Sequence, residues 1–326
     1  MTSICPHGRL SARLCESLED VRIQPGRRWS ATVRDRTITQ ESAAALRAPL
    51  IRTLYDVLHA GRREGTSRSR SLRDARLEAQ FADATPHRTT IAQARIVEAA
   101  NGPREAIVEV SGVRVSAPAG TIGAPEGASG AGATVTVALP AARPAVSPGF
   151  FLADGSLGRP GHSPLLRVYV NIADSDDAPA AWHQALSRLE EKRIRYRAKI
   201  LSTPRSYPRT DAMVIYLGAD AWHLAADLPR MLGRLPGTGS ATSVFARQLA
   251  PGIAMAWEPA DDRLGHTHLS YGQHRSAALT DALIRHADTQ GTPTLDALVH
   301  EALIEAGVDP LAPERNTDSP ELELAR

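Results

Sequence analysis

Short apolar runs in the second half of the chain most constrain the fold that this sequence can adopt. Residues 165–172 and 212–217 are rich in Val, Ile, Leu and Tyr, and each run is typical of a buried β-strand. A further strand is predicted at 252–257. No run approaches the ~18 apolar residues of a membrane span. We therefore expect strands in a packed core and no membrane association.

Helical patterns lie between and after these strands. Apolar residues recur on one face over 178–193, and further helices are predicted at 219–234, 272–287 and 294–306. Strands and helices do not alternate as regular βαβ units. The pattern therefore predicts an α+β fold, with mixed or antiparallel sheets and helices packed around them, and not a Rossmann fold.

The first half of the chain has weaker patterns. Leucines four residues apart predict a helix from Glu41 to Gly61, and alternating residues predict a hairpin at 107–115 and a strand at 134–139. The strongly charged stretch 62–90 is expected to be mobile. We divide the chain into three parts: an N-terminal helical and hairpin region at 1–144, a core domain at 145–308, and a flexible tail at 309–326.

Composition and missing motifs exclude several functions. A net charge of +2 and 4% aromatic residues argue against a nucleic-acid-binding surface. Phosphate-binding glycine loops, HExxH and GxSxG are absent. His266 and His268 have the spacing of a metal pair on a strand, but no third ligand is apparent, so we expect no metal. The segment Met1–Leu10 has no apolar stretch, and we expect a cytoplasmic protein.

Lysine is scarce in this chain, which has only Lys192 and Lys199 among 38 lysine and arginine residues. Lysine differs from arginine in that it can lose its proton and act as a base. Strand alternation places Arg195, Arg197 and Lys199 on one face. Two interpretations stay open: Lys199 is a base at an anion site, or it is a chance remainder of a bias toward arginine.

Other Arg, His and Tyr residues gather in the second half. Arg209 is either a phosphate ligand or the partner of Asp211, two residues later on the same strand. His274 and Arg275 open a predicted helix, where backbone N–H groups and the helix dipole favour an anion. Together these residues resemble an anion site with a base and an acid.

The order of five segments resembles the HopA-type effector domain. These are Arg167–Asn171, Lys199–Pro204, Tyr207–Ala212, Phe245–Gly252 and Ser270–Arg275. The resemblance covers roughly 145–290, with a looser match around Leu54–Asp56. This family was first described in type III secreted effectors. It also occurs as a stand-alone protein in actinobacterial clusters for class V lanthipeptides and thioamitides.

The resemblance implies a lyase that eliminates phosphate from phosphoserine or phosphothreonine to give dehydroalanine or dehydrobutyrine. Combined with the chemistry of the side chains, it suggests these roles: Lys199 as base, His274 as acid, Tyr207 or Tyr271 as donor to the enolate oxygen, and Arg197, Arg209, Arg247 and Arg275 as phosphate ligands. Cations beside Lys199 would favour its neutral amine. No cofactor is expected.

The implied partners are a precursor peptide, with a leader and a phosphorylated core, and a separate kinase. The hairpin at 107–115 offers an edge to which a leader could add as a strand, or its strands simply complete a sheet of the protein. Two alternatives remain: a non-catalytic scaffold that binds phosphorylated or acidic peptides, and an effector-like protein that acts on a phosphorylated host protein.

Overall fold

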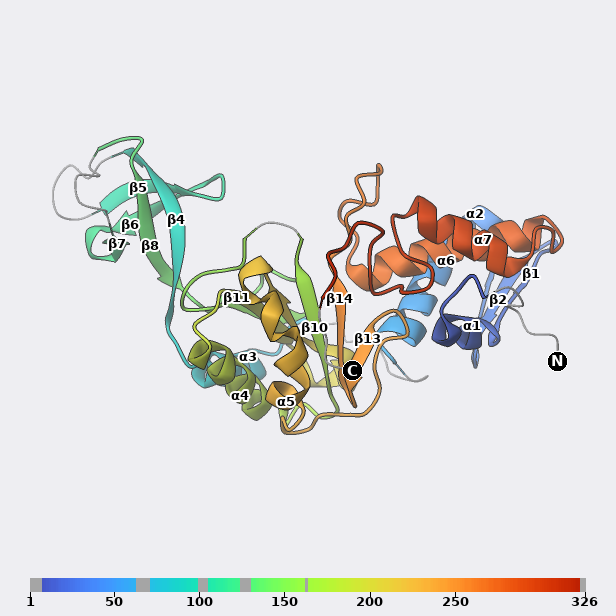
Figure 1. Ribbon diagram of the computed structural model, residues 1–326, viewed down its shortest axis with the longest axis horizontal. Helices are drawn as coiled ribbons and strands as arrows, with labels where there is room; N and C mark the ends of the chain where they lie inside the picture. The colour runs from blue at the N-terminus through green and yellow to red at the C-terminus, as the bar shows by residue number, and fades with distance from the viewer. Residues whose placement is uncertain (1–7, 63–70, 99–104, 124–129, 162–163, 323–326) are drawn as a thin grey trace.

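The computed structural model describes residues 8–62, 71–98, 105–123, 130–161 and 164–322. Figure 1 shows an elongated molecule: a small sheet at one end, a central sheet with helices, and a helical part with three short strands at the other end. Helices and antiparallel sheets occupy these parts without βαβ units, so the predicted α+β class is confirmed. No helix among the described residues is long and apolar enough to cross a bilayer.

The central sheet has six antiparallel strands in the order β13-β14-β10-β12-β11-β9. Their bounds are β9 Phe150–Asp154, β10 Leu166–Ile172, β11 Tyr196–Leu201, β12 Arg209–Leu217, β13 Arg247–Ala250 and β14 Ile253–Trp257. The three predicted apolar strands are the adjacent strands β14, β10 and β12. Strands β10 and β14 are buried at every position, which explains their apolar sequences.

One face of this sheet is covered by α3 (Ala75–Ala84), α4 (Ala178–Glu191), a 3₁₀ segment η4 (Ala219–Asp227) and α5 (Leu228–Leu232). Trp182 of α4 is fully buried between Phe81 and Phe151. Two expectations were wrong here. Helix α3 lies inside 62–90, because its apolar face packs on α4 despite the many charges. The helix predicted at 219–234 is split into η4 and α5, since Pro229 starts the α-helical turn at its second position.

The other face carries α2 (Ala43–Leu54) with its π-helical end η1 (Tyr55–His59), and beside them α6 (Tyr271–Asp288) and α7 (Leu295–Glu305) (Figure 1). The remaining N-terminal elements are α1 Ala12–Leu18, β1 Val21–Gln24, β2 Trp29–Val33 and β3 Arg36–Gln40. A single hydrophobic core joins residues 10–58 with residues 244–308. Residues 10–58 therefore pack with the C-terminal helices.

The small sheet has the order β6-β5-β4-β8-β7 and its own apolar core. Its strands are β4 Thr89–Glu98, β5 Glu105–Val110, β6 Val113–Pro118, β7 Ile122–Gly123 and β8 Thr134–Pro140, with a 3₁₀ turn η2 at Ala119–Thr121. The predicted hairpin is β5–β6 and the predicted strand at 134–139 is β8. Strand β6 is an outer strand and, among the described residues, pairs with β5 alone.

Residues 309–319 of the C-terminal segment, which was expected to be flexible, pack against the core, and residues 323–326 lie outside the described residues. The backbone N–H of Trp257 donates to the Glu314 carbonyl at 2.8 Å, and Val308 forms a β-bridge with Asn316. The Asn316 side chain is buried and donates to the Glu258 carbonyl. The polar composition of this segment favoured a flexible tail, but several of its polar groups bond to the rest of the protein.

Candidate functional site

Strand β11 places its side chains alternately on the two faces of the central sheet. Tyr196, Ala198 and Ile200 are buried in the core beneath α4, whereas Arg197 and Lys199 remain partly exposed on the opposite face. The predicted common face of the cations is therefore confirmed. It follows from the two-residue period of a strand and the apolar residues between the charges.

A cleft of about 980 Å³ lies over this face, between the central sheet and the small sheet. Its charged lining consists of Arg143, Arg159, Arg167, Arg195, Arg197, Lys199, Asp154 and Glu258. Six cations thus face two carboxylates. This excess of positive charge suits a multiply charged anion such as a phosphate group.

Both carboxylates of the cleft are already paired with arginine. Asp154 accepts two bonds from Arg197, at 2.6 and 3.1 Å, and lies 3.0 Å from Nε of Arg143. Glu258 forms a bidentate pair with Arg167. These pairs hold the arginine side chains in place and leave the excess positive charge at the other cations.

Lys199 makes no salt bridge to any residue that the structure describes. Its Nζ instead lies 4.4 Å from the centre of the Phe150 ring and 5.7 Å from that of Tyr216. Its amine is therefore held by aromatic rings and lines the cleft beside fixed guanidinium groups. A general base must have a free lone pair within reach of the substrate proton. An amine paired with a carboxylate would not meet this condition.

Tyr216 of β12 is a cleft residue that the sequence reasoning missed. Its ring lies between Lys199 and Arg167, whose Cζ is 5.1 Å from the ring centre. Within the described ranges its hydroxyl has no hydrogen-bond partner, and Tyr216 is the one residue of β12 that is not fully buried. Tyr216 pairs in register with Arg197, so the two side chains share one face of the sheet. This register becomes known only when the two strands are paired.

A buried polar network lies next to Lys199. Arg209 donates to both carboxylate oxygens of Asp211, at 2.7 and 2.6 Å, and to the hydroxyl of Tyr55 at 2.7 Å. Asp211 also accepts from Tyr55 at 3.1 Å. Phe150 contacts both sides of this arrangement, because Arg209 Cζ lies 5.8 Å and Lys199 Nζ lies 4.4 Å from the centre of its ring. Of the two roles considered for Arg209, the structure shows the pair with Asp211.

The residues of this network shift one another's pKa values. The Arg209 guanidinium, followed by His59 and Lys199, holds the pKa of Asp211 well below its usual range against the opposing effect of burial. Burial raises the pKa of Tyr55, and the charge of Asp211 adds to that effect. The carboxylate therefore stays charged and Tyr55 stays protonated, so the network forms a fixed layer under the cleft.

His59, at the end of η1, connects this network to α6. Its Nδ1 lies 2.9 Å from the Ser243 hydroxyl and its Nε2 lies 3.6 Å from Asp211. Burial lowers the pKa of His59 to about 4. A Cβ atom at position 272 would lie 2.2 Å from the His59 ring, so Gly272 allows α6 to pack against the imidazole. Sequence reasoning missed His59, although it noted a match around Tyr55.

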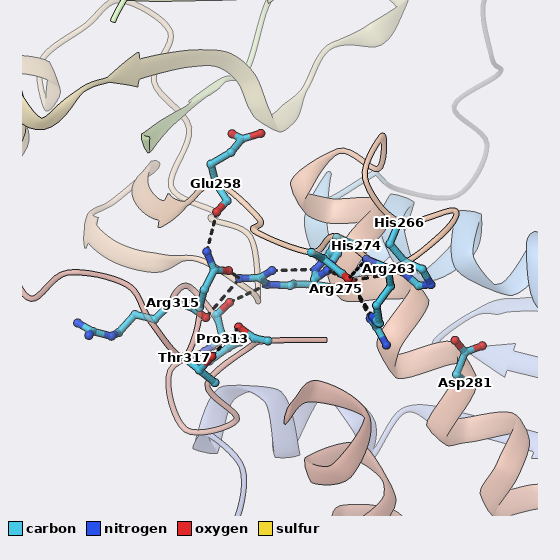
Figure 2. Close-up of polar contacts among 12 residues, drawn as sticks. Glu258, Arg263, His266, His274, Arg275, Asp281, Pro313, Arg315 and Thr317 are labelled. Carbon is cyan, nitrogen blue, oxygen red and sulfur yellow. Dashed lines mark hydrogen bonds and ion pairs between the residues drawn. The ribbon is translucent and has the colours of Figure 1, made fainter. Parts of the chain in front are cut away.

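His274 and Arg275 are held in a separate cluster at the start of α6, shown in Figure 2. His274 donates from Nε2 to Asp261 at 2.8 Å and accepts at Nδ1 from Arg275 at 2.8 Å. Burial, with the neighbouring Arg275, lowers the pKa of His274 to about 4. Both ring nitrogens are occupied and His274 does not line the cleft, so the structure does not place it as the acid for a phosphate there.

Arg275 binds the C-terminal segment (Figure 2). It donates to the carbonyls of Pro313 and Arg315, at 3.0 and 3.3 Å, and to the Asn316 side chain at 2.9 Å. Its side chain is fully buried. Arg275 therefore holds this segment against α6 and is not available as a phosphate ligand.

Three further predicted site residues also lie outside the cleft. The Tyr207 hydroxyl donates to the Leu201 carbonyl at 2.9 Å in the core. Tyr271 donates to the carbonyls of Phe245 and Pro313. Arg247 is exposed on β13, the edge of the sheet opposite to β9. Of the predicted residues, the structure brings together Lys199 and Arg197 in the cleft, with Arg209 beneath them.

His266 lies beside the His274 cluster, with Nδ1 3.6 Å from Asp261, and not beside the cleft. His268 follows in the same exposed loop. In the part of the chain that the structure describes, no three metal-ligating side chains come together.

Residues 141–315 match the family model of the HopA1 effector protein family. The chain belongs to this family. The match contains Lys199, Arg197 and the central sheet, whereas the small sheet and the N-terminal elements precede it. The cleft is therefore walled on one side by the HopA1 region and on the other by residues outside it.

Two effector proteins of Pseudomonas syringae are similar in structure. The one from pathovar tomato strain DC3000 is 22% identical and the one from pathovar syringae strain 61 is 16% identical, each with a TM-score of 0.39. Each match covers 51% of this chain and 62% of the effector, so the chain spans less than two thirds of their length. No curated protein matches this chain.

Proposed function

We propose that this protein is a lyase that eliminates phosphate from phosphoserine or phosphothreonine in a peptide. One observation carries the proposal: Lys199 lines the cleft without a carboxylate partner among the described residues, where six cations face two carboxylates. An elimination needs a base for the Cα proton and positive charge for the leaving group. The cleft offers both within one cavity.

The reaction is balanced by the peptide and this one base. Neutral Lys199 takes the Cα proton, and the C–H electrons pass onto the carbonyl oxygen as an enolate. These electrons then form the Cα=Cβ double bond as the Cβ–O bond breaks. The phosphate leaves with the Cβ–O electron pair and takes up the proton from the Lys199 ammonium, which restores the neutral amine. Arg195 would stabilise the departing charge from the same wall, together with Nη1 of Arg197, the guanidinium nitrogen that does not bond to Asp154. This role does not require a histidine acid, because the phosphate leaves as an anion among guanidinium groups.

Tyr216 is the tyrosine among the described residues that line the cleft, and its hydroxyl can donate to the carbonyl oxygen as the enolate develops. It replaces Tyr207 and Tyr271 in this role, since both of those hydroxyls donate to backbone carbonyls. A donor aimed at developing charge contributes about 2.7–4 kcal/mol in known oxyanion holes. Its position between Lys199 and Arg167 favours this role.

The physiological substrate we propose is a precursor peptide, with a leader and a phosphorylated core, of lanthipeptide or thioamitide type. A separate kinase would phosphorylate it in the cytoplasm. The resemblance of the segments from Arg167 to Arg275 supports this setting. The outer strand β6 offers an edge for the leader.

Mass spectrometry of a phosphoserine peptide incubated with the purified protein tests the activity. We expect the peptide to lose the mass of phosphoric acid, whereas simple hydrolysis would leave the hydroxyl. A reaction that persists undiminished in Lys199→Ala would overturn the assignment of the base. If leader, kinase and phosphopeptide together give only binding, and Lys199→Arg binds equally well, the protein is a scaffold and not an enzyme.

A further inference from the structure

We propose that the cleft selects phosphopeptides in which apolar residues flank the phosphorylated residue, and that the small sheet binds these flanking side chains. This inference rests on the proposed function for the identity of the anion. It adds a substrate preference that the phosphate-binding wall alone does not provide.

The first observation is where exposed apolar side chains gather. The described residues leave these large apolar side chains exposed: Leu72, Ile91, Val113, Val146, Leu157, Leu264, Ile304 and Leu311. Half of them, Ile91, Val113, Val146 and Leu157, line this one cleft. Val113 and Val146 are 60% and 62% exposed. Apolar residues that gather in a groove, rather than singly over the surface, are typical of a binding site.

The second observation is that the two walls of the cleft differ in chemistry. The wall from the β5–β6 hairpin presents Val110, Val113 and Val115, whereas the wall from the central sheet presents Lys199 and its neighbouring arginines. A ligand that satisfies both walls carries an anionic group and apolar groups on different sides. Inorganic phosphate or a polar phosphopeptide would leave the apolar wall in contact with water.

The third observation favours an extended peptide as the occupant. Strand β6 pairs on one side with β5 and is the outer strand of its sheet. Val113 and Val115, which share one face of β6, both line the cleft. An added peptide strand would bond to the outer edge of β6, with which no described strand pairs, and would place alternate side chains near those valines, with the others turned away. The hydrogen bond from Arg159 to Ser111 ties the hairpin to the rim of the cleft.

The test compares two phosphoserine peptides that differ only in their flanking residues. One carries valine or leucine on either side of the phosphoserine and the other carries serine or asparagine. We expect kcat/KM to be higher for the apolar peptide by on the order of tenfold for each side chain buried, mainly through KM. Equal values of kcat/KM for the two peptides would overturn the inference while leaving the lyase intact.

Variants then locate the preference. Val113→Ser and Val113→Ser with Val146→Ser should each lower kcat/KM for the apolar peptide by about tenfold or more and leave the polar peptide within about twofold. Serine is chosen because it adds no charge near the phosphate. Leu311→Ser is the matched control, since Leu311 is also 60% exposed but lies outside the cleft. An equal loss in the control, or an unchanged preference in Val113→Ser, would refute the role of the small sheet. An unchanged preference in the double variant, which also alters Val146 between β8 and β9, would refute the apolar residues of the cleft as the binding site.

Binding by Lys199→Arg separates this inference from the proposed function. Fluorescence anisotropy of the labelled phosphopeptides should show tighter binding of the apolar peptide, lost in Val113→Ser, even if the wild type eliminates no phosphate. That result would support the preference for apolar flanking residues and would contradict the proposed lyase activity. Binding of anionic lipid vesicles in place of either peptide would overturn the peptide as the occupant.

Discussion

The cleft over β11 and the cluster at the start of α6 both contain arginine and carboxylate side chains, but they differ in how many of their polar groups have hydrogen-bond partners. In the α6 cluster, both nitrogens of His274 and the donors of Arg275 bond to neighbouring protein groups. In the cleft, Lys199 and the Tyr216 hydroxyl lack such partners among the described residues. The comparison teaches that polar side chains without hydrogen-bond or ion-pair partners in the protein indicate a binding site, whereas polar side chains with such partners serve the fold.

The largest expected effect is on the rate of elimination. Lys199→Arg keeps the charge and removes the base, so we expect kcat to fall about 10³-fold, with the free energy of unfolding nearly unchanged. Lys192→Arg is the matched control, because Lys192 is the other lysine and is exposed at the end of α4. Timed mass spectrometry gives the rates. A similar loss of kcat in both variants would show that Lys199 has no special role as the base in the cleft.

The next effect is on stability in the α6 cluster. Arg275→Ala removes the donors that hold Pro313 and Asn316 and opens a cavity, so unfolding should become easier by about 3–5 kcal/mol. Arg285→Ala, on the exposed side of the same helix, should cost under about 1 kcal/mol. Urea denaturation measures both variants. Faster hydrogen exchange at 309–319 in Arg275→Ala alone would show that Arg275 holds this segment.

The buried histidines predict how stability changes with pH. The pKa of both His59 and His274 is lowered to about 4 from 6.5, so the unfolded chain binds more protons between those values. Their contribution is complete above pH 6.5 and is lost as the pH falls toward 4, by at most about 3 kcal/mol for each histidine. Urea midpoints at pH 7 and pH 5 measure the loss. His274→Gln should reduce this pH dependence, because it removes one of the two buried imidazoles.

A smaller effect is expected at the enolate donor. Tyr216→Phe keeps the ring beside Lys199 and removes the hydroxyl, so we expect kcat to fall about 10²-fold with KM nearly unchanged. Tyr207→Phe is the comparison, because that hydroxyl bonds to the Leu201 carbonyl in the core and its loss should lower stability rather than kcat. If the two variants show the reverse pattern, the earlier assignment of Tyr207 is the better one.

The smallest effect is expected at Arg247. Its side chain is exposed on β13, so Arg247→Ala should change the free energy of unfolding by less than about 0.5 kcal/mol and kcat/KM by less than twofold. Arg197→Ala, which removes a cation from the cleft and leaves Asp154 with one arginine fewer, should raise KM. Steady-state kinetics on one phosphopeptide compares the two. Equal KM values would place the anion outside the cleft.

Local patterns predicted the parts of the fold that depend on near neighbours. The apolar runs of β10, β12 and β14 were recognisable because central strands are buried on both faces. The alternation in β11 predicted that Arg197 and Lys199 share a face. The chain order of the five segments also indicated the family, which the match over 141–315 shows. These features are encoded within a few residues or in their order.

Long-range packing decided the rest. Tyr55 and His59 reach Asp211 across more than a hundred residues of chain, and Arg275 meets Asn316 only because the C-terminal segment folds back. The periodicity of helices and strands in the sequence does not indicate which polar groups form such long-range contacts. The sequence by itself determined the central strands and the face that carries Lys199. Only the tertiary structure decided which charged side chains are paired and which line the cleft without a partner. The physical reason is that pairing requires atoms from distant segments to come within about 3 Å of each other.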